Sequence, residues 1–149
     1  MSILTYMIVI WGGTEDYIIR SAQVMQNKAA KLVTRTFDLY TPTRVLLKQC
    51  GWLSVRQLIF YHSVLQIWKT RRSLKPWHIH SNLIESRTRS ANIGNLKIPV
   101  TTTALAAKSF MVRAPNFWNE TPPEIRACES LNTFKKNLKE FIILKVPID

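Results

Sequence analysis

Residues that could carry chemistry are few in this sequence and far apart. The only adjacent acidic residues are Glu15 and Asp16, and they begin a predicted helix, where carboxylates interact favourably with the helix dipole. The four glycines form no phosphate-binding loop, and no serine stands in a nucleophile-elbow motif. No two carboxylates are placed by a recognised acid–base motif. We therefore expect no catalytic residue and no cofactor.

The residues that commonly bind metals are also scattered. Cys50 and Cys128 are far apart, and the three histidines lack the spacing of a zinc finger. His78 and His80 could place two ligands on one side of a strand, but no third or fourth ligand lies nearby. We expect no metal site and two reduced, buried thiols in an intracellular protein.

The charge balance is the strongest property of the whole chain. Its 149 residues include 21 Lys and Arg against nine Asp and Glu, which gives a formal net charge of +12. Such a surface attracts nucleic acid because each neutralised phosphate releases condensed counterions, and it also attracts anionic membranes. A basic face that only interacts with solvent is the plain alternative. We predict nucleic acid as the partner and no membrane.

The predicted nucleic-acid contacts are cations from several parts of the chain and one tryptophan: Lys28, Lys31, Arg35, Arg71, Arg72, Trp77, Arg87, Arg89, Lys135, Lys136 and Lys139. Half of the net charge falls between Lys69 and Lys97, where Glu85 is the only acidic residue. An aromatic side chain among cations is typical of surfaces that stack nucleic-acid bases. Trp77 could equally anchor this segment to the core.

The first 13 residues are mostly apolar up to Gly12 and Gly13. This run is about half the ~20 residues that a membrane-spanning helix requires, and no cation precedes it as in a signal peptide. We expect instead the back part of a buried helix whose front part is missing, as in a fragment of a longer protein.

Capping residues and apolar spacing predict helices over 14–35, 41–50, 54–74, 104–113 and 131–144. In the first, the residues Ile18, Ala22, Met25, Ala29, Leu32 and Val33 recur at helical spacing, and the cations of the other side would face solvent. Thr41 and Pro42 begin the second, which Gly51 ends. Ser54 and Gln57 form a capping box, with a hydrophobic staple between Leu53 and Leu58.

The remaining signals are local. His62 is predicted at the margin of the apolar side of its helix, as a residue of the core edge. Residues 76–103 are predicted as a basic loop with a short strand over 96–100. Pro115 is expected to end the helix before it, and 110–126 to be an irregular packing joint. The fold class is therefore mainly α, a small bundle of about five helices in a single domain over 1–149.

Four stretches of the chain resemble one known family: "SILTYMIVIWGG", "AQVMQNKAAKLVTR", "TPTRVLLKQCGWLSVRQL" and "FMVRAPNFWNETPPEIRACESLNTFKKNLKEFI". They look like the C-terminal region of reverse transcriptase polyproteins of LINE-type, jockey-like retrotransposons. Trp52 in a Gly-Trp-Leu-x-Val-Arg block and Ala114-Pro115-x-x-Trp118-Asn119 are the most specific pieces. Relatives usually have Leu-Pro where this chain has Thr121-Pro122.

The resemblance implies a non-catalytic module that binds template RNA or target DNA. Residues 1–75 would form a helical half that follows the polymerase thumb, and 104–149 a C-terminal helical segment. The catalytic aspartates of an RNA-directed DNA polymerase lie upstream in that family, so the upstream polymerase is a further expected partner. A ribonucleoprotein of nucleus and cytoplasm would be its setting.

Three other interpretations stay open. The chain could be a structural or protein-interaction module whose apolar N-terminus docks on another protein. It could be a decayed or domesticated remnant with no nucleic-acid role. The helices at 41–50 and 54–74 could also form a DNA reader of helix-turn-helix type.

Overall fold

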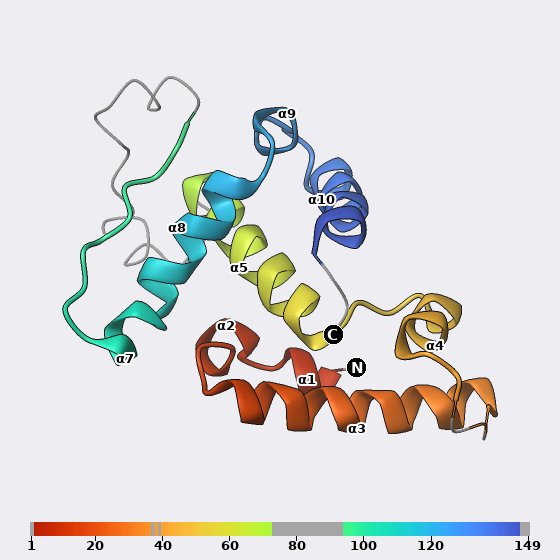
Figure 1. The fold of residues 1–149 in the computed structure, drawn as a ribbon. Helices are drawn as coiled ribbons and strands as arrows, with labels where there is room; N and C mark the ends of the chain where they lie inside the picture. The colour runs from red at the N-terminus through yellow and green to blue at the C-terminus, as the bar shows by residue number, and fades with distance from the viewer. Residues whose placement is uncertain (1, 37, 39, 73–93, 147–149) are drawn as a thin grey trace.

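The computed structural model describes residues 2–36, 38, 40–72 and 94–146. Within these residues the chain forms nine helices and no strand, which confirms the predicted mainly helical fold (Figure 1). Four of the helices are single turns, so the five longer ones account for most of the architecture. The helices are α1 (Ser2–Thr5), α2 (Ile8–Trp11), α3 (Asp16–Thr34), α4 (Thr43–Cys50), α5 (Val55–Arg71), α7 (Ala104–Ala107), α8 (Phe110–Glu120), α9 (Pro123–Arg126) and α10 (Leu131–Lys145).

Helix α5 is the central element, packed against α8, α10, α2 and α3. Aromatic pairs make two of these contacts: Phe60 lies 4.7 Å from Phe117 on α8 between ring centroids, and Trp68 stacks on Phe134 of α10 at 5.1 Å. Buried aromatic area of this kind dominates core energetics. The main core is therefore built around α5, with α8 and α10 on it (Figure 1).

The start of α5 follows the sequence prediction. Ser54 accepts a hydrogen bond from the Gln57 backbone N–H, and the Ser54 N–H donates back to the Gln57 side chain at 3.0 Å, which confirms the capping box. Leu53 and Leu58, the predicted staple, are both buried in the core. The Gln57 amide also donates to the Val146 carbonyl oxygen at 2.8 Å, which ties the end of α10 to the start of α5.

Helix α3 faces its neighbours with a side that lies about 90° around the helix from the expected one. Met25 and Leu32 are 63% and 68% exposed, whereas the helix buries Ile19, Gln26 and Ala30. The reason is hydrogen bonding at the start of α5. The Gln26 amide donates to the Leu53 carbonyl at 2.8 Å, and the Val55 N–H donates to the Gln23 side chain at 2.8 Å. These amides satisfy backbone groups that an apolar side could not.

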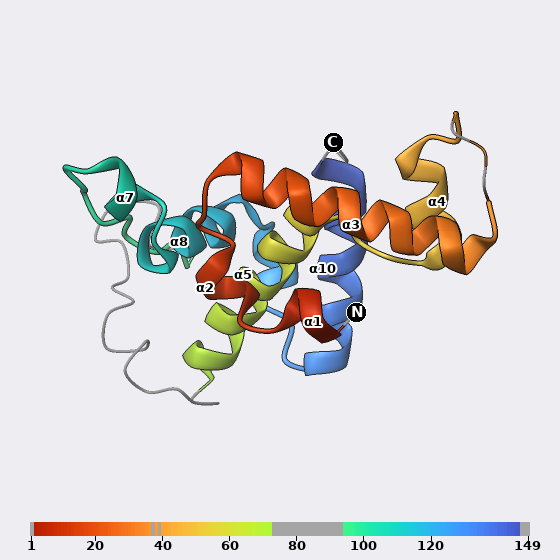
Figure 2. The ribbon, with the colours of Figure 1, turned by 90° about the horizontal axis from the view of Figure 1, so that it is seen from below.

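Helix α4 begins at Thr43, with Pro42 as its N-cap residue, one position later than predicted. It ends as predicted at Gly51, which adopts the left-handed conformation with φ 65°. Leu46 and Leu47 pack with Ala30 of α3 in a small second core. Through this contact α4 is attached to the far end of α3 (Figures 1 and 2).

The prediction that Pro115 ends a helix is wrong, because Pro115 lies inside α8. Proline removes one backbone donor from a helix, but here Pro115 is buried, as are Ala114 and Trp118, in a helix that packs on α5. The Asn116 side chain also donates to the Val112 carbonyl at 3.0 Å. Apolar burial thus offsets the lost hydrogen bond, and only the α8–α9 connection retains the expected irregularity.

The strand predicted over 96–100 is also wrong, since the described residues of this segment form no strand. The backbone N–H and C=O groups of Leu96 form hydrogen bonds with a side chain instead of with another strand. The Leu96 N–H donates to the Asn119 side-chain oxygen at 2.8 Å, and the Asn119 amide donates to the Leu96 carbonyl at 2.9 Å. One asparagine on α8 therefore replaces the neighbouring strand.

The N-terminal segment is two short helices and not part of one buried helix. Met7 interrupts it in the left-handed conformation with φ 47°, and of the two turns only Ile8 is buried. A Cβ atom on Gly12 would lie 2.6 Å from the Ile8 carbonyl oxygen, so no larger residue fits there. Among the described helices, none is long and apolar enough to cross a membrane.

The final helix matches its prediction closely. It follows Ser130 and buries Phe134, Leu138 and Ile142 completely, while Lys136 and Lys139 are exposed. Lys135 differs from the prediction, since it is half-buried. His62 is half-buried at the edge of α5, as predicted, with its ring edge-on to Tyr61 at 5.3 Å between centroids.

Candidate nucleic-acid interface

The predicted cations that the structure describes lie in three separate places. Lys28 and Lys31 are on α3, Arg35 is its C-cap residue, and Lys135, Lys136 and Lys139 are on α10. Arg71 and Arg72 are at the end of α5. Trp77, Arg87 and Arg89, like His78 and His80, lie outside the described residues. The described members thus belong to three elements, which differ in their contacts.

Arg71 and Arg72 make internal contacts. The Arg72 guanidinium lies 4.6 Å from the Trp68 ring centroid and donates to the Cys128 carbonyl oxygen at 2.6 Å. Arg71 lies 5.7 Å from the ring of Trp118. Cation–π contacts of this kind stabilise packing. Both arginines therefore help to join α5 to the α8–α9 region.

Arg126 completes this internal cluster. Its guanidinium lies 5.8 Å from the centroid of the Trp118 ring and donates to the Asn95 side chain at 2.8 Å. Burial lowers the pKa of Arg126 and the charge of Arg71 lowers it further, while Glu124 raises it. Arg126 also donates to the Gly94 carbonyl oxygen at 3.2 Å, and so holds the 94–96 segment against α8 and α9. Because its side chain is buried, it offers little surface to a ligand.

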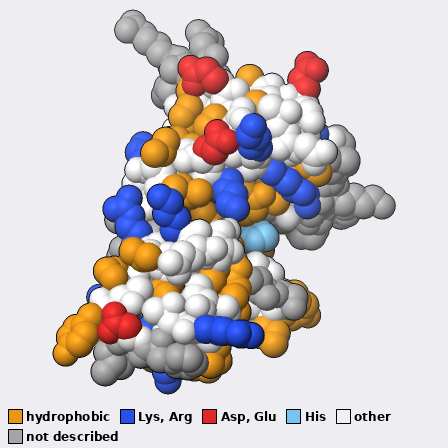
Figure 3. All heavy atoms as spheres, turned by 90° about the vertical axis from the view of Figure 1, so that its right-hand side faces the viewer, with side chains coloured by type: hydrophobic (Ala, Val, Ile, Leu, Met, Phe, Trp, Pro, Cys, Tyr) orange, Lys and Arg blue, Asp and Glu red, His pale blue; other side chains and the backbone are white. Residues whose placement is uncertain are grey.

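The cations of α4 and α10 meet at a groove, which we name the α4–α10 groove. It has a volume of about 560 Å³. Four cationic side chains line it, and so do apolar ones from both helices and from the turn between α4 and α5; the cations are Arg44, Lys48, Lys139 and Lys145, and the large apolar residues are Leu47, Trp52, Ile143 and Leu144. None of the described residues that line it is acidic. In Figure 3, where α4 and α10 face the viewer, a row of Lys and Arg side chains crosses the middle of the molecule with hydrophobic side chains between them.

The backbone of the turn after α4 helps to shape this groove. The Lys139 ammonium donates to the Gly51 carbonyl oxygen at 3.2 Å, so α10 contacts the turn directly. Lys145 lies 5.5 Å from the Phe141 ring on the same helix. Neither contact is with a carboxylate, so among the described residues neither lysine is paired with an acidic side chain.

Trp52 supplies the aromatic surface of the groove. Its ring is half-buried and packs against the small core formed by Ala30, Leu46 and Leu47. Its indole N–H donates to no other described residue. A ring held rigidly on one side and open on the other can stack on a planar ligand at little entropic cost.

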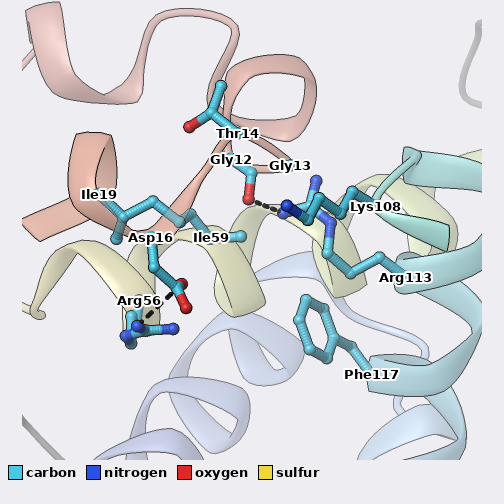
Figure 4. Close-up of a pocket in the computed structure, with 10 residues that line it drawn as sticks. All are labelled: Gly12, Gly13, Thr14, Asp16, Ile19, Arg56, Ile59, Lys108, Arg113 and Phe117. Carbon is cyan, nitrogen blue, oxygen red and sulfur yellow. Dashed lines mark hydrogen bonds and ion pairs between the residues drawn. The ribbon is translucent and has the colours of Figure 1, made fainter. Parts of the chain in front are cut away.

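A second hollow lies between α2, α3, α5 and α8, but its charges are matched (Figure 4). It has a volume of about 220 Å³ and three cationic lining residues. Arg56 pairs with Asp16 at 3.1 Å, and Lys108 pairs with Glu15 at 2.6 Å. The third, Arg113, donates to backbone carbonyls, and burial lowers the pKa of its guanidinium. These contacts join the helices around the hollow to one another and leave its charged groups occupied by partners within the protein.

Among the residues that the structure describes, no three His, Cys, Asp or Glu side chains lie close enough together to bind a metal ion. Cys50 and Cys128 are free thiols, as expected, but both are half-buried and not buried as predicted.

Sequence reasoning identified only Lys139 of the groove. It did not single out the groove residues Arg44, Lys48, Lys145 and Trp52 as candidate contacts. The four-residue spacing of Arg44 and Lys48 places them on one side of a helix, and this signal was present in the sequence. That α4 would lie beside α10, from the other end of the chain, has no local signal.

Comparison of the chain with protein-family models, with curated proteins and with solved structures finds no match in any of the three.

Proposed function

We propose that this chain binds a single nucleic-acid strand in the α4–α10 groove, as the non-catalytic C-terminal segment of a retrotransposon reverse transcriptase. One observation carries the proposal: four cations from two helices converge on a groove that contains an indole ring and no described acidic residue. The family assignment rests on the resemblance of the quoted sequence stretches.

The groove suits a single strand better than a duplex for a chemical reason. A single strand presents phosphates to the cations and unpaired bases to an apolar, aromatic floor, whereas a duplex hides its base faces. Neutralising four phosphates of a single strand gives a slope of about −3 in a plot of log affinity against log salt. Stacking on Trp52 adds a contribution that salt does not weaken.

The test is a titration of fluorescent single-stranded RNA, single-stranded DNA and duplex DNA, by anisotropy, between about 50 and about 300 mM salt. The expected result is tighter binding of the single strands than of the duplex. Binding of all three with equal affinity and slope would indicate diffuse attraction to the net charge and reject the groove.

A matched pair of variants locates the site. One carries Arg44→Gln, Lys48→Gln, Lys139→Gln and Lys145→Gln, and its control carries Lys28→Gln, Lys31→Gln, Arg35→Gln and Lys136→Gln. Both lose the same formal charge, so only the location differs. We expect the groove variant to lose most of its single-strand affinity and salt slope, and the control to keep most of both. Equal losses contradict the proposal.

The family part has a separate test in the genome. An open reading frame for a polymerase palm directly upstream of this coding sequence is the expected finding, and its absence would leave only the binding proposal.

A further inference from the structure

Helix α3 exposes a line of large apolar side chains. The helix lies along the lower edge of the molecule in Figure 1 and crosses the face seen in Figure 2. Ile18, Met25 and Leu32 on it are 39%, 63% and 68% exposed, and we name these three residues the α3 stripe. Apolar side chains that are exposed together, and not singly, mark an interaction site.

The α3 stripe follows the helix axis. Its members are seven residues apart, so Ile18 and Leu32 lie within about 20° of Met25 around the helix and about 21 Å from each other along it. A narrow line of this spacing matches the apolar seam of one partner helix, which recurs every seven positions. None of the three side chains is aromatic, so the stripe offers no flat ring on which a nucleic-acid base can stack.

Exposed cations border the stripe on one side. Lys28 lies about 60° around the helix from Met25, and Arg20 lies about 140° away in the same direction. Arg35, the C-cap residue, adds a third exposed cation at the end of the helix. In the other direction around the helix, Ala22 packs against the main core. The exposed surface of α3 is therefore apolar along the stripe and positively charged beside it.

The charge of this surface is not balanced by α3 itself. Residues 17–35 include no Asp or Glu. Glu15 and Asp16, which precede this range, form ion pairs with cations outside α3. Within the part of the chain that the structure describes, none of the three bordering cations forms an ion pair. Their charge complements carboxylates of a partner.

We infer that the α3 stripe binds an acidic amphipathic helix of a partner protein. The apolar side of that helix covers the stripe, and its carboxylates face Lys28 and Arg20. Opposite charges across an interface speed the encounter and fix the register, while buried side chains near the centre supply most of the affinity. No described residue of α3 lines the α4–α10 groove, so this inference does not depend on the proposed function.

Binding of a synthetic peptide tests the inference. The probe is a fluorescent peptide of three heptads with Leu at positions a and d, Glu at e and g, and Ala elsewhere, and its Glu residues keep it from pairing with itself. One control peptide has Lys in place of every Glu, and another has Gln in place of every Leu. In anisotropy titrations of the full chain, both controls should bind at least about tenfold more weakly than the probe.

A matched pair of variants locates the contact, and each replaces three exposed apolar residues with Gln, which keeps a high helix propensity. The stripe variant carries Ile18→Gln, Met25→Gln and Leu32→Gln, and its control carries Ile98→Gln, Val100→Gln and Leu105→Gln. We expect the stripe variant to bind the probe about 100-fold more weakly and the control to bind it as the unaltered chain does. Circular dichroism verifies that both are folded, and neither should change the affinity for single-stranded RNA.

A charge reversal tests the complementarity. Lys28→Glu and Lys97→Glu change the formal charge equally, and both lysines are exposed. Lys28→Glu should weaken binding of the probe at least about tenfold, whereas Lys97→Glu should change it little. Equal effects of the two variants would mean that the probe responds only to the net charge, which contradicts the inference.

Two further results overturn the inference. One is an unchanged affinity of the stripe variant for the probe, because binding would then occur elsewhere on a chain with a net charge of +12. The other comes from vesicles of phosphatidylcholine and phosphatidylserine. If the chain binds these vesicles through the stripe residues and does not bind the probe, the surface recognises lipid and not a helix.

Discussion

Arg113 on α8 donates a hydrogen bond to the carbonyl oxygen of Gly12, which follows α2, although 101 positions separate the two residues (Figure 4). The same guanidinium donates to the Val9 carbonyl oxygen at 3.0 Å. Both acceptors lie at the C-terminal end of a helix, where a positive charge is favoured by the helix dipole. One arginine thus holds the N-terminal turns against the body of the protein.

Replacing Arg113 with Met should lower the free energy of unfolding by about 3 kcal/mol, because two carbonyls lose a charged donor in a partly buried site. Urea unfolding followed by circular dichroism measures this change. Arg20→Met is the control, since Arg20 is exposed on α3, and it should change stability by less than about 0.5 kcal/mol. Equal effects of the two variants would show that the Arg113 contacts contribute nothing.

The stack of Trp68 on Phe134 is expected to be a major source of stability. Phe134 is fully buried, so Phe134→Ala should cost about 3–5 kcal/mol through lost burial and a residual cavity. Leu144→Ala on the same helix removes an 88% exposed side chain and should cost less than about 0.5 kcal/mol. Thermal unfolding compares the two, and a small loss for Phe134→Ala would mean that α10 is not firmly packed on α5.

His62 should make stability depend on pH near neutrality. Burial lowers the pKa of His62 below its ordinary value of 6.5, and the charge of Lys69 lowers it further. The unfolded chain therefore takes up a proton at a higher pH than the folded chain does. Stability is fully present above pH 6.5 and is lost as the pH falls from there through the folded pKa.

The measurement is urea unfolding of the protein and of His62→Gln at several values between about pH 8 and about pH 5.5, where the carboxylates remain ionised. The variant should show a flatter pH dependence. An unchanged profile would mean that His62 titrates alike in the folded and unfolded chains.

Trp52 should contribute to single-strand affinity without contributing to its salt dependence. Trp52→Leu keeps an apolar side chain against Leu46 and Leu47 but removes the stacking surface. We expect a loss of about 1–3 kcal/mol in binding, with the slope against salt unchanged. Anisotropy titrations at several salt concentrations measure both quantities, and circular dichroism verifies that the variant is folded. A loss in slope instead would indicate that Trp52 acts by positioning the neighbouring cations.

Local signals in the sequence predicted local structure well. The Ser54–Gln57 capping box, the left-handed Gly51 and the buried side of α10 all depend on residues within a few positions of one another, and all three were confirmed. The error at Pro115 has a different cause. The cost of proline in a helix is local, but the burial that offsets it comes from α5, some fifty positions earlier in the chain.

Long-range hydrogen bonds explain the other errors. Nothing near Asn119 indicates that its amide will bind the backbone of Leu96, and nothing near Gln26 indicates that it will bind Leu53. The same limit applies to the candidate site. The cations of each helix could be read from spacing, but the groove also requires α10 to lie at the turn after α4, where Lys139 donates to Gly51, 88 positions away in the chain.

The amide contacts under α3 have a consequence for how the protein opens. Where Gln23 and Gln26 hold α3 on α5, detachment breaks specific hydrogen bonds and uncovers Ile19 of the main core. Denaturant sensitivity scales with the area exposed, so local opening of this contact should depend less steeply on urea than global unfolding, which also exposes the buried apolar residues of α5. In native-state hydrogen exchange, the N-terminal half of α3 should thus lose protection by a motion with a smaller urea dependence than that of α5, which exchanges only through global unfolding.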